Sequence, residues 1–185
     1  GTWDYSVWPD ANTSYDATEL YSFIEDQSPY VYDRNAKTIT FTTRGAQIYS
    51  ARLNDYKTYD STDLYLIKPN ASQMGITVYA GENVNTKDFV FSVAEHTDSS
   101  IVMQLPFAGG GYIQQKYTLA EGSYMMQNEL SFVGMENIIP RNVSNVDIDW
   151  SVVIPRLEKG YKNEKQYSKL DYYFTGDKKS EEIAR

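Results

Sequence analysis

Apolar and polar residues alternate along most of the chain after Tyr30, which is the pattern of β-strands with one buried face and one wet face. The alternation is clearest over residues 38–68, where it breaks once at Arg44-Gly45 and turns at residues 54–57. Further short apolar runs follow at spacings of roughly 8–12 residues, as in β-sandwiches and barrels. The pattern therefore predicts an all-β fold, a twisted antiparallel β-sandwich of two sheets with little helix.

Two turns and one later strand can be placed more closely. Asp98-Ser99-Ser100 predicts a hairpin tip between two strands, and residues 121–123, with a central glycine, predict a second tight hairpin. Apolar residues occupy every second position in the middle of a predicted strand over residues 143–154. This alternation predicts that Trp150 is buried in the core.

The remaining connections differ in their expected form. Gly109-Gly110-Gly111 is expected to be a flexible break between strands. The charged stretch over residues 156–170 fits either a solvent-facing helix or a loop with a bent strand. A final strand is expected over residues 170–175, and a helix is expected to begin in the tail after Lys178.

Composition divides the chain into three parts. Residues 1–29 are acidic and polar and predict an N-terminal arm, in which residues 16–24 fit either a short capped helix or an edge strand. Residues 30–176 form the predicted sandwich, and residues 177–185 form a C-terminal tail. Because the sequence opens on Gly1 and has no apolar run of about 20 residues, we expect an excised soluble domain of a longer protein.

The charge and the cysteine count exclude several classes of function. The net charge is −8, which makes the chain a poor candidate for binding nucleic acid or an anionic lipid surface. The chain contains no cysteine, so disulfides, thiol catalysis and thiolate metal sites are excluded. Seven acidic residues precede the first cationic one, Arg34, whereas the end of the chain is mixed in charge and rich in lysine. The difference fits two poles for different partners or simply two solvated faces, and we favour the solvated faces.

The residue types that usually carry catalysis are sparse and scattered. His96 is the only histidine, and it lies beside a predicted turn without a partner at any motif spacing, so we expect neither a general base nor a zinc site there. Asp147 and Asp149 are about 7 Å apart on one strand face. Paired carboxylates can hydrolyse glycosides or bind calcium. These two aspartates alternate with the apolar positions, however, and are expected to face solvent. We therefore predict no catalytic, cofactor-binding or metal-binding residue, and no cofactor.

Aromatic residues give the strongest functional lead that residue chemistry alone provides. Trp3, Trp8 and Trp150, with the abundant tyrosines, could line a cleft for a carbohydrate or a peptide by stacking. The simpler interpretation is that Trp150 belongs to the core and that the two early tryptophans hold the arm in place. We favour the simpler interpretation.

Several patches in fixed order resemble the periplasmic domain of the YidC-type membrane-protein insertases. The first is an alternating strand, a Gly-Gly turn and a second strand ending in Leu-x-x-Tyr, except that Ala46 replaces the second glycine in this chain. The later patches are an aromatic hairpin and a Trp-bearing strand followed by Glu-Lys-Gly and a second glutamate. The matching residues are 39–46, 48–60, 117–119, 122–132, 149–150, 157–160 and Glu164.

This resemblance implies a fold and a function for roughly residues 30–176. The fold would be a β-supersandwich of the galactose-mutarotase-like type. The full-length protein would insert and fold inner-membrane proteins, alone or with the Sec translocon, and this domain would lie on the periplasmic side of the inner membrane. Membrane-spanning helices would precede Gly1 and follow Arg185. The implied partners are Sec components and nascent membrane proteins, and the family's membrane groove contributes no residue here, so no catalytic residue carries over.

A second functional class remains open at this stage. The same architecture, by analogy of fold alone, suggests a carbohydrate-binding or carbohydrate-active domain. Sugar epimerisation on such a sandwich needs a histidine and an acid facing one cleft. With a single histidine beside a turn, the non-catalytic interaction domain is the preferred hypothesis.

Overall fold

The computed structural model describes residues 20–24, 37–108, 110–143, 145–174 and 176–183. Trp3 and Trp8, and most of the predicted arm, lie outside these residues. Within the arm, β1 (Leu20–Ile24) is a strand at the end of a sheet, so the edge-strand alternative is confirmed for these five residues. The division of the chain at residues 29 and 176 stays a prediction.

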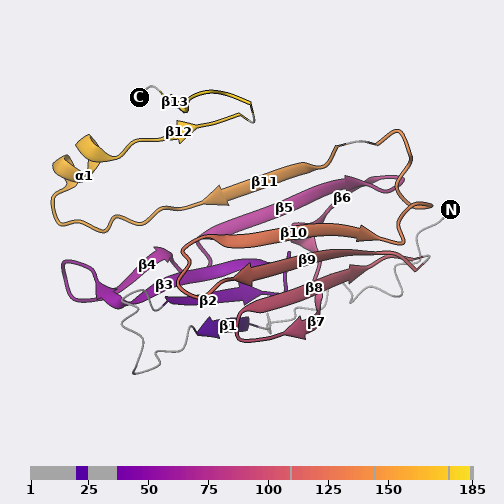
Figure 1. Ribbon diagram of the computed structural model, residues 1–185, viewed down its shortest axis with the longest axis horizontal. Coiled ribbons are helices and arrows are strands. Elements are labelled where there is room, and N and C mark those ends of the chain that lie inside the picture. Colours follow the sequence, from indigo (N-terminus) through magenta and orange to yellow (C-terminus); the bar gives the residue numbers. More distant parts are fainter. Residues whose placement is uncertain (1–19, 25–36, 109, 144, 175, 184–185) are drawn as a thin grey trace.

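The described strands form a sandwich of two facing layers (Figure 1). One layer is the sheet β10-β9-β8-β7, and the other consists of the sheet β1-β2-β3-β4 and the adjoining sheet β11-β5-β6. Every strand pairing is antiparallel, which confirms the predicted all-β antiparallel fold. The strands are β2 (Lys37–Thr42), β3 (Gln47–Lys57), β4 (Asp63–Ile67), β5 (Ser72–Tyr79), β6 (Asn83–Asn85), β7 (Ser92–His96), β8 (Ser100–Pro106), β9 (Tyr112–Leu119), β10 (Met126–Val133) and β11 (Asp147–Val152).

Both predicted hairpins are present. The Thr97 N–H donates to the Ser100 carbonyl at 2.8 Å and closes the tip between β7 and β8. The second hairpin joins β9 to β10, where the Ser123 N–H donates to the Ala120 carbonyl at 3.1 Å. Gly122 has a φ of +68° there, a conformation that glycine adopts without steric cost.

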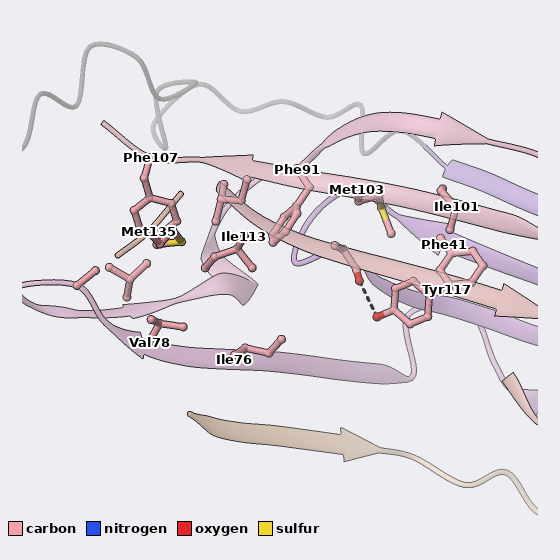
Figure 2. Close-up of a cluster of buried hydrophobic side chains, with 14 residues drawn as sticks. Phe41, Ile76, Val78, Phe91, Ile101, Met103, Phe107, Ile113, Tyr117 and Met135 are labelled. Atoms are coloured by element: carbon pink, nitrogen blue, oxygen red, sulfur yellow. Dashed lines mark hydrogen bonds between the residues drawn. The ribbon is translucent and has the colours of Figure 1, made fainter. Parts of the chain in front are cut away.

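The core lies between the layers and is built by the period-two pattern of β8, β9 and β5 (Figure 2). In β9 the residues at 113, 115, 117 and 119 are buried and those between them are half-buried. The Phe41 ring from the facing layer meets the Tyr117 ring with 4.8 Å between centroids. The buried cluster consists of Phe41, Ala46, Ile76, Val78, Ala80, Val84, Phe91, Ile101, Met103, Leu105, Phe107, Ile113, Tyr117 and Met135.

A buried polar network joins the two layers at the Arg44-Gly45-Ala46 turn. The Tyr117 hydroxyl lies 2.8 Å from the Ala46 carbonyl and 2.8 Å from the Gln115 Oε1, and it can donate to one of them at a time. The Gln115 side-chain amide donates to the Gly45 carbonyl at 3.4 Å. Gly45 and Ala46 have φ angles of +71° and +49°. The turn therefore uses left-handed backbone at both positions, at a cost of about 1–2 kcal/mol for the alanine.

The expected flexible break at the glycine triplet is wrong for Gly111, which is buried and closely packed. The Phe107 N–H donates to the Gly111 carbonyl at 2.7 Å. A Cβ placed on Gly111 would lie 2.7 Å from the Gly134 carbonyl oxygen. Glycine is needed here because two backbone segments approach each other, and the segment makes a tight turn.

The predicted burial of Trp150 is also wrong. Trp150 lies on β11 as expected, but its side chain is 63% exposed, and the neighbouring Ile148 is 62% exposed. The strand is an end strand of its sheet, and the facing layer ends at β10, so none of the described strands covers this part of β11 (Figure 1). The alternation identified the correct face of the strand but not what lies opposite that face.

The carboxyl-terminal part contains only short elements. The stretch predicted as helix or bent strand holds the helix α1 (Tyr161–Tyr167), none of whose residues is buried. The predicted strand after Leu170 is present as β12 (Asp171–Tyr172). The helix expected in the tail is wrong, because β13 (Glu181–Glu182) pairs with β12 instead.

Candidate binding surface

The residues weighed for catalysis do not come together. His96 is exposed at the end of β7, and Asp147 and Asp149 are exposed on β11. These two strands run along opposite sides of the sandwich (Figure 1). Within the described residues there is also no group of three or more His, Asp or Glu side chains placed to hold a metal ion. The prediction of no catalytic, cofactor or metal residue stays a prediction.

The perturbed titratable groups have structural explanations. The hydrogen bond from the Lys57 ammonium, with a second one from the Arg52 guanidinium, lowers the pKa of Asp63 at the start of β4. Burial raises the pKa of the Tyr117 phenol in the core. The Asp63 shift therefore reflects a surface ion pair, and the Tyr117 shift reflects a packed core.

Exposed apolar side chains gather in the last quarter of the chain. Of the nineteen exposed large apolar side chains among the described residues, eleven fall between residues 148 and 183. The buried core, by contrast, ends at Met135. Four of the eleven, Ile154, Tyr161, Leu170 and Ile183, line a common groove, and exposed apolar side chains that lie together mark interaction sites. The eleven residues are Ile148, Trp150, Val153, Ile154, Tyr161, Tyr167, Leu170, Tyr172, Tyr173, Phe174 and Ile183.

The apolar face of β11 continues the inner face of the sheet. Directly opposite residues of antiparallel strands share a face, and Ile148 pairs with the buried Ile76, and Trp150 with Met74. The indole Nε1 of Trp150 donates to the Ser72 Oγ at 3.1 Å, which fixes the ring over β5. Ile148 and Trp150 therefore extend the core face beyond the edge of the opposite layer.

The backbone of β11 also has one unpaired edge. Among the described strands, β11 pairs only with β5, and the Val153 N–H donates to the Ala71 carbonyl at 2.8 Å in the same register. Antiparallel pairing alternates, so Asp147, Asp149 and Ser151 bond to β5. The N–H and C=O groups of the residues between them, at 148, 150 and 152, point away from β5. On β5, the N–H groups of the residues facing 148 and 150 donate to side chains elsewhere, which agrees with this pattern.

A groove of about 510 Å³ lies between the segment after β11, α1 and the β12–β13 pair. At its rim the Glu164 Oε1 accepts from the Leu157 N–H at 2.9 Å, and the Glu164 Oε2 lies 3.5 Å from the Arg156 Nε. Its lining mixes apolar and cationic side chains: Ile154, Pro155, Arg156, Tyr161, Glu164, Lys165, Ser168, Lys169, Leu170 and Ile183.

Charge differs between this part and the rest of the chain. Residues 156–183 contain seven lysines and arginines and six aspartates and glutamates. All other residues together contain ten cationic and nineteen anionic side chains. The lysine-rich pole expected from the sequence therefore coincides with the exposed apolar groove, while β11 itself is anionic.

The unpaired edge of β11 was not anticipated from the sequence. Polar and apolar residues alternate strictly over 146–152, but this alternation does not reveal whether a strand is central or terminal. That depends on which strands pair, and the β5–β11 pairing joins residues more than seventy positions apart.

Comparison with known proteins agrees with the fold. The family model described as the YidC periplasmic domain matches residues 33–181. A membrane protein insertase YidC of Porphyromonas gingivalis is 34% identical over 141 residues, covering 75% of this chain and 22% of the relative. One of Bacteroides fragilis is 33% identical over 144 residues, covering 77% and 23%. One of Parabacteroides distasonis is 30% identical over 142 residues, covering 75% and 22%.

The chain spans less than a quarter of the length of each of these three relatives. No solved structure matches it. Among the described residues, no helix has the length and apolar character needed to cross a bilayer. The match to the family model covers most of the chain, and the chain belongs to the family of YidC periplasmic domains.

Proposed function

We propose that this chain is a non-catalytic interaction domain on the periplasmic side of the inner membrane, within a protein that inserts and folds membrane proteins. In this proposal the full-length protein acts alone or with the Sec translocon, and the domain contacts polypeptide outside the bilayer. The observation that carries the proposal is the exposed apolar surface of residues 148–183.

The physical requirements of such a domain are modest. A binding domain needs a rigid scaffold and an exposed apolar area, and both the core and the surface described above supply these. Because the domain is tethered to the same protein as the membrane part, its partners are held at a high local concentration. Contacts that are individually weak are then sufficient.

Photocrosslinking from single positions of the full-length protein in living cells tests this proposal. A photoreactive residue at Trp150 or Tyr167 should form crosslinks to Sec subunits or to newly made membrane proteins. The same residue at His96, on the opposite side of the sandwich, is the matched control and should give fewer such crosslinks. Crosslinks to lipid only, or to no protein from any of the three positions, would contradict the proposal.

The carbohydrate alternative makes a different prediction. It requires a histidine and an acid on one cleft, whereas His96 and the Asp147–Asp149 pair lie on opposite sides of the sandwich. Titration of the domain with neutral sugars, followed by tryptophan fluorescence, should give no saturable change. Saturable binding in the micromolar range would favour a sugar-binding domain instead.

A further inference from the structure

We propose that the unpaired edge of β11 binds an extended segment of a client membrane protein, which adds to the sheet as a further strand. The preferred segment alternates apolar and basic residues. This inference rests on the proposed function as an interaction domain, and it names the site and the chemistry of the partner.

The backbone of β11 offers a complete template for such a strand. The residues at 148, 150 and 152 direct their N–H and C=O groups away from β5, so three donors and three acceptors lie along the edge. An unpaired row of this kind is what an added strand recognises, since its main chain supplies the complementary groups.

The two faces of β11 specify the side chains of the partner. Ile148 and Trp150 lie on the inner face with large exposed areas, so they offer apolar cross-strand contacts. Asp147 and Asp149 lie on the outer face, opposite Thr77 and Gly75 of β5. Among the described residues, neither aspartate forms an ion pair with a cationic side chain. Basic residues on the outer face of an added strand would supply the missing charge partners.

A second copy of this chain fits the edge poorly. If β11 paired antiparallel with itself, the outward-directed residues 148, 150 and 152 of the two copies would face one another, and the aspartates would face residues of odd number. Registers centred on residues 147 to 149 place aspartates directly opposite aspartates, and like charges opposite each other destabilise a cross-strand pair. The register centred on Trp150 places Asp149 opposite Ser151, so no register centred within β11 gives either aspartate a cationic partner. An anionic lipid surface is repelled by the same two carboxylates.

Peptide binding tests this inference on the 185-residue chain and on the full-length protein in detergent, since the chain spans less than a quarter of its relatives. The probe is a capped peptide of about eight residues that alternates valine and lysine. The controls are a peptide of the same composition in scrambled order and one that alternates valine and glutamate. Amide exchange followed by NMR should show that the N–H groups of Ile148, Trp150 and Val152 become protected only with the valine–lysine peptide.

Two variants distinguish main-chain pairing at the β11 edge from nonspecific binding of the peptide. In Val152→Pro the lost N–H is one that points away from β5, so the sheet keeps its bonds but the added strand loses one. Its control, Val152→Thr, keeps the N–H and should bind normally. In the double variant Asp147→Lys with Asp149→Lys, binding of the valine–lysine peptide should weaken about tenfold and binding of the valine–glutamate peptide should strengthen.

Several outcomes would overturn the inference. Equal binding of all three peptides would overturn it, and so would unchanged binding by Val152→Pro. Protection of the β11 edge before peptide is added would also overturn it. If that protection depends on protein concentration it indicates self-association, and if it is found in the full-length protein it means that other residues of the same protein pair with the edge. Binding to vesicles containing anionic phospholipid in place of the peptide would also overturn it. The proposed function would survive each of these results if crosslinks from Tyr167 to client proteins persisted, so the two failures can be distinguished.

Discussion

Residues 37–139, the body of the sandwich, differ in burial from residues 147–183, which begin with its end strand β11, although β8, β9 and β11 share the same period-two pattern. In the sandwich, alternate residues of β8 and β9 are fully enclosed between two layers. In the carboxyl-terminal part, every residue of β11 except Val152 is exposed, and α1 has no buried residue. The comparison shows that a hydrophobic pattern fixes the orientation of side chains, whereas burial depends on a facing element.

The difference has consequences for stability and for function. The two-residue pairing of β12 with β13 is too short to be stable alone, and the surrounding apolar side chains have few packing partners. Such a region is expected to open locally at low cost, while the sandwich opens only with global unfolding. The sandwich therefore acts as the scaffold, and the carboxyl-terminal part provides the surface available to a partner.

The largest expected effect contrasts two phenylalanines. Phe41 is 0% exposed and packs against the tilted ring of Tyr117, so Phe41→Ala should lower the free energy of unfolding by about 3–5 kcal/mol. Phe174 is the matched control in the open part, and Phe174→Ala should cost less than about 1 kcal/mol. Urea denaturation measures both values. Equal losses would show that the two regions are equally packed.

A second contrast uses two glycines. In Gly111→Ala the new Cβ would meet the backbone of Gly134 at 2.7 Å, and we expect a loss of about 1–3 kcal/mol. At Gly160 the Cβ would meet only the Asn163 side chain, at an ordinary 3.6 Å. Gly160→Ala should therefore change stability by no more than about 0.5 kcal/mol. Thermal unfolding of both variants tests the tight turn at residue 111, and a neutral Gly111→Ala would contradict it.

The polar network in the core gives a smaller effect with a distinctive dependence on pH. Tyr117→Phe removes the hydroxyl that bonds the Ala46 carbonyl and should cost about 1–2 kcal/mol at neutral pH. Burial raises the pKa of this phenol above that of the unfolded chain, near 10. The stabilisation it gives is therefore complete below about pH 10 and is lost as the pH rises above that value.

The measurement is the free energy of unfolding of both proteins at a series of alkaline pH values. The difference in the free energy of unfolding between wild type and Tyr117→Phe should shrink as the pH rises. The reason is that the Tyr117 phenol ionises more readily in the unfolded wild-type chain than in the folded one, which favours unfolding, and the variant lacks this phenol. A difference that stays constant through the alkaline range would show that the Tyr117 phenol titrates as an exposed tyrosine does.

The smallest effect is expected at Trp150. Its side chain is 63% exposed and makes one hydrogen bond to Ser72, so Trp150→Ala should cost less than about 1 kcal/mol. A value near that of Phe41→Ala would mean that β11 is covered in solution. The same variant should also weaken binding of the valine–lysine peptide, because the Trp150 side chain is one of the apolar contacts that β11 offers to an added strand.

Much of the fold could be predicted from the sequence because its determinants are local. The hairpins at residues 98–100 and 121–123 follow from turn residues between alternating strands, and both are confirmed. The order of the strands is not local. The position of β11 at the end of a sheet depends on its pairing with β5, and the exposure of Trp150 depends on the facing layer ending at β10.

The glycine turn at residue 111 illustrates the same limit on a smaller scale. From the sequence alone, three consecutive glycines predict a conformationally flexible segment. In the structure, Gly111 is constrained by the backbone of Gly134, which belongs to a different connection. Close approach between distant segments gives glycine a packing role that the sequence does not distinguish from flexibility.

Residue-resolved hydrogen exchange of the free chain tests the central claim most directly, because it measures which backbone groups are already paired. The amides of Ile113 and Tyr117 should exchange only with global unfolding. Along β11, the amides of Asp149 and Ser151 should be protected and those of Ile148, Trp150 and Val152 should exchange rapidly. Uniform protection along β11, equal to that of β9, would contradict the claim that this edge of the sandwich is open.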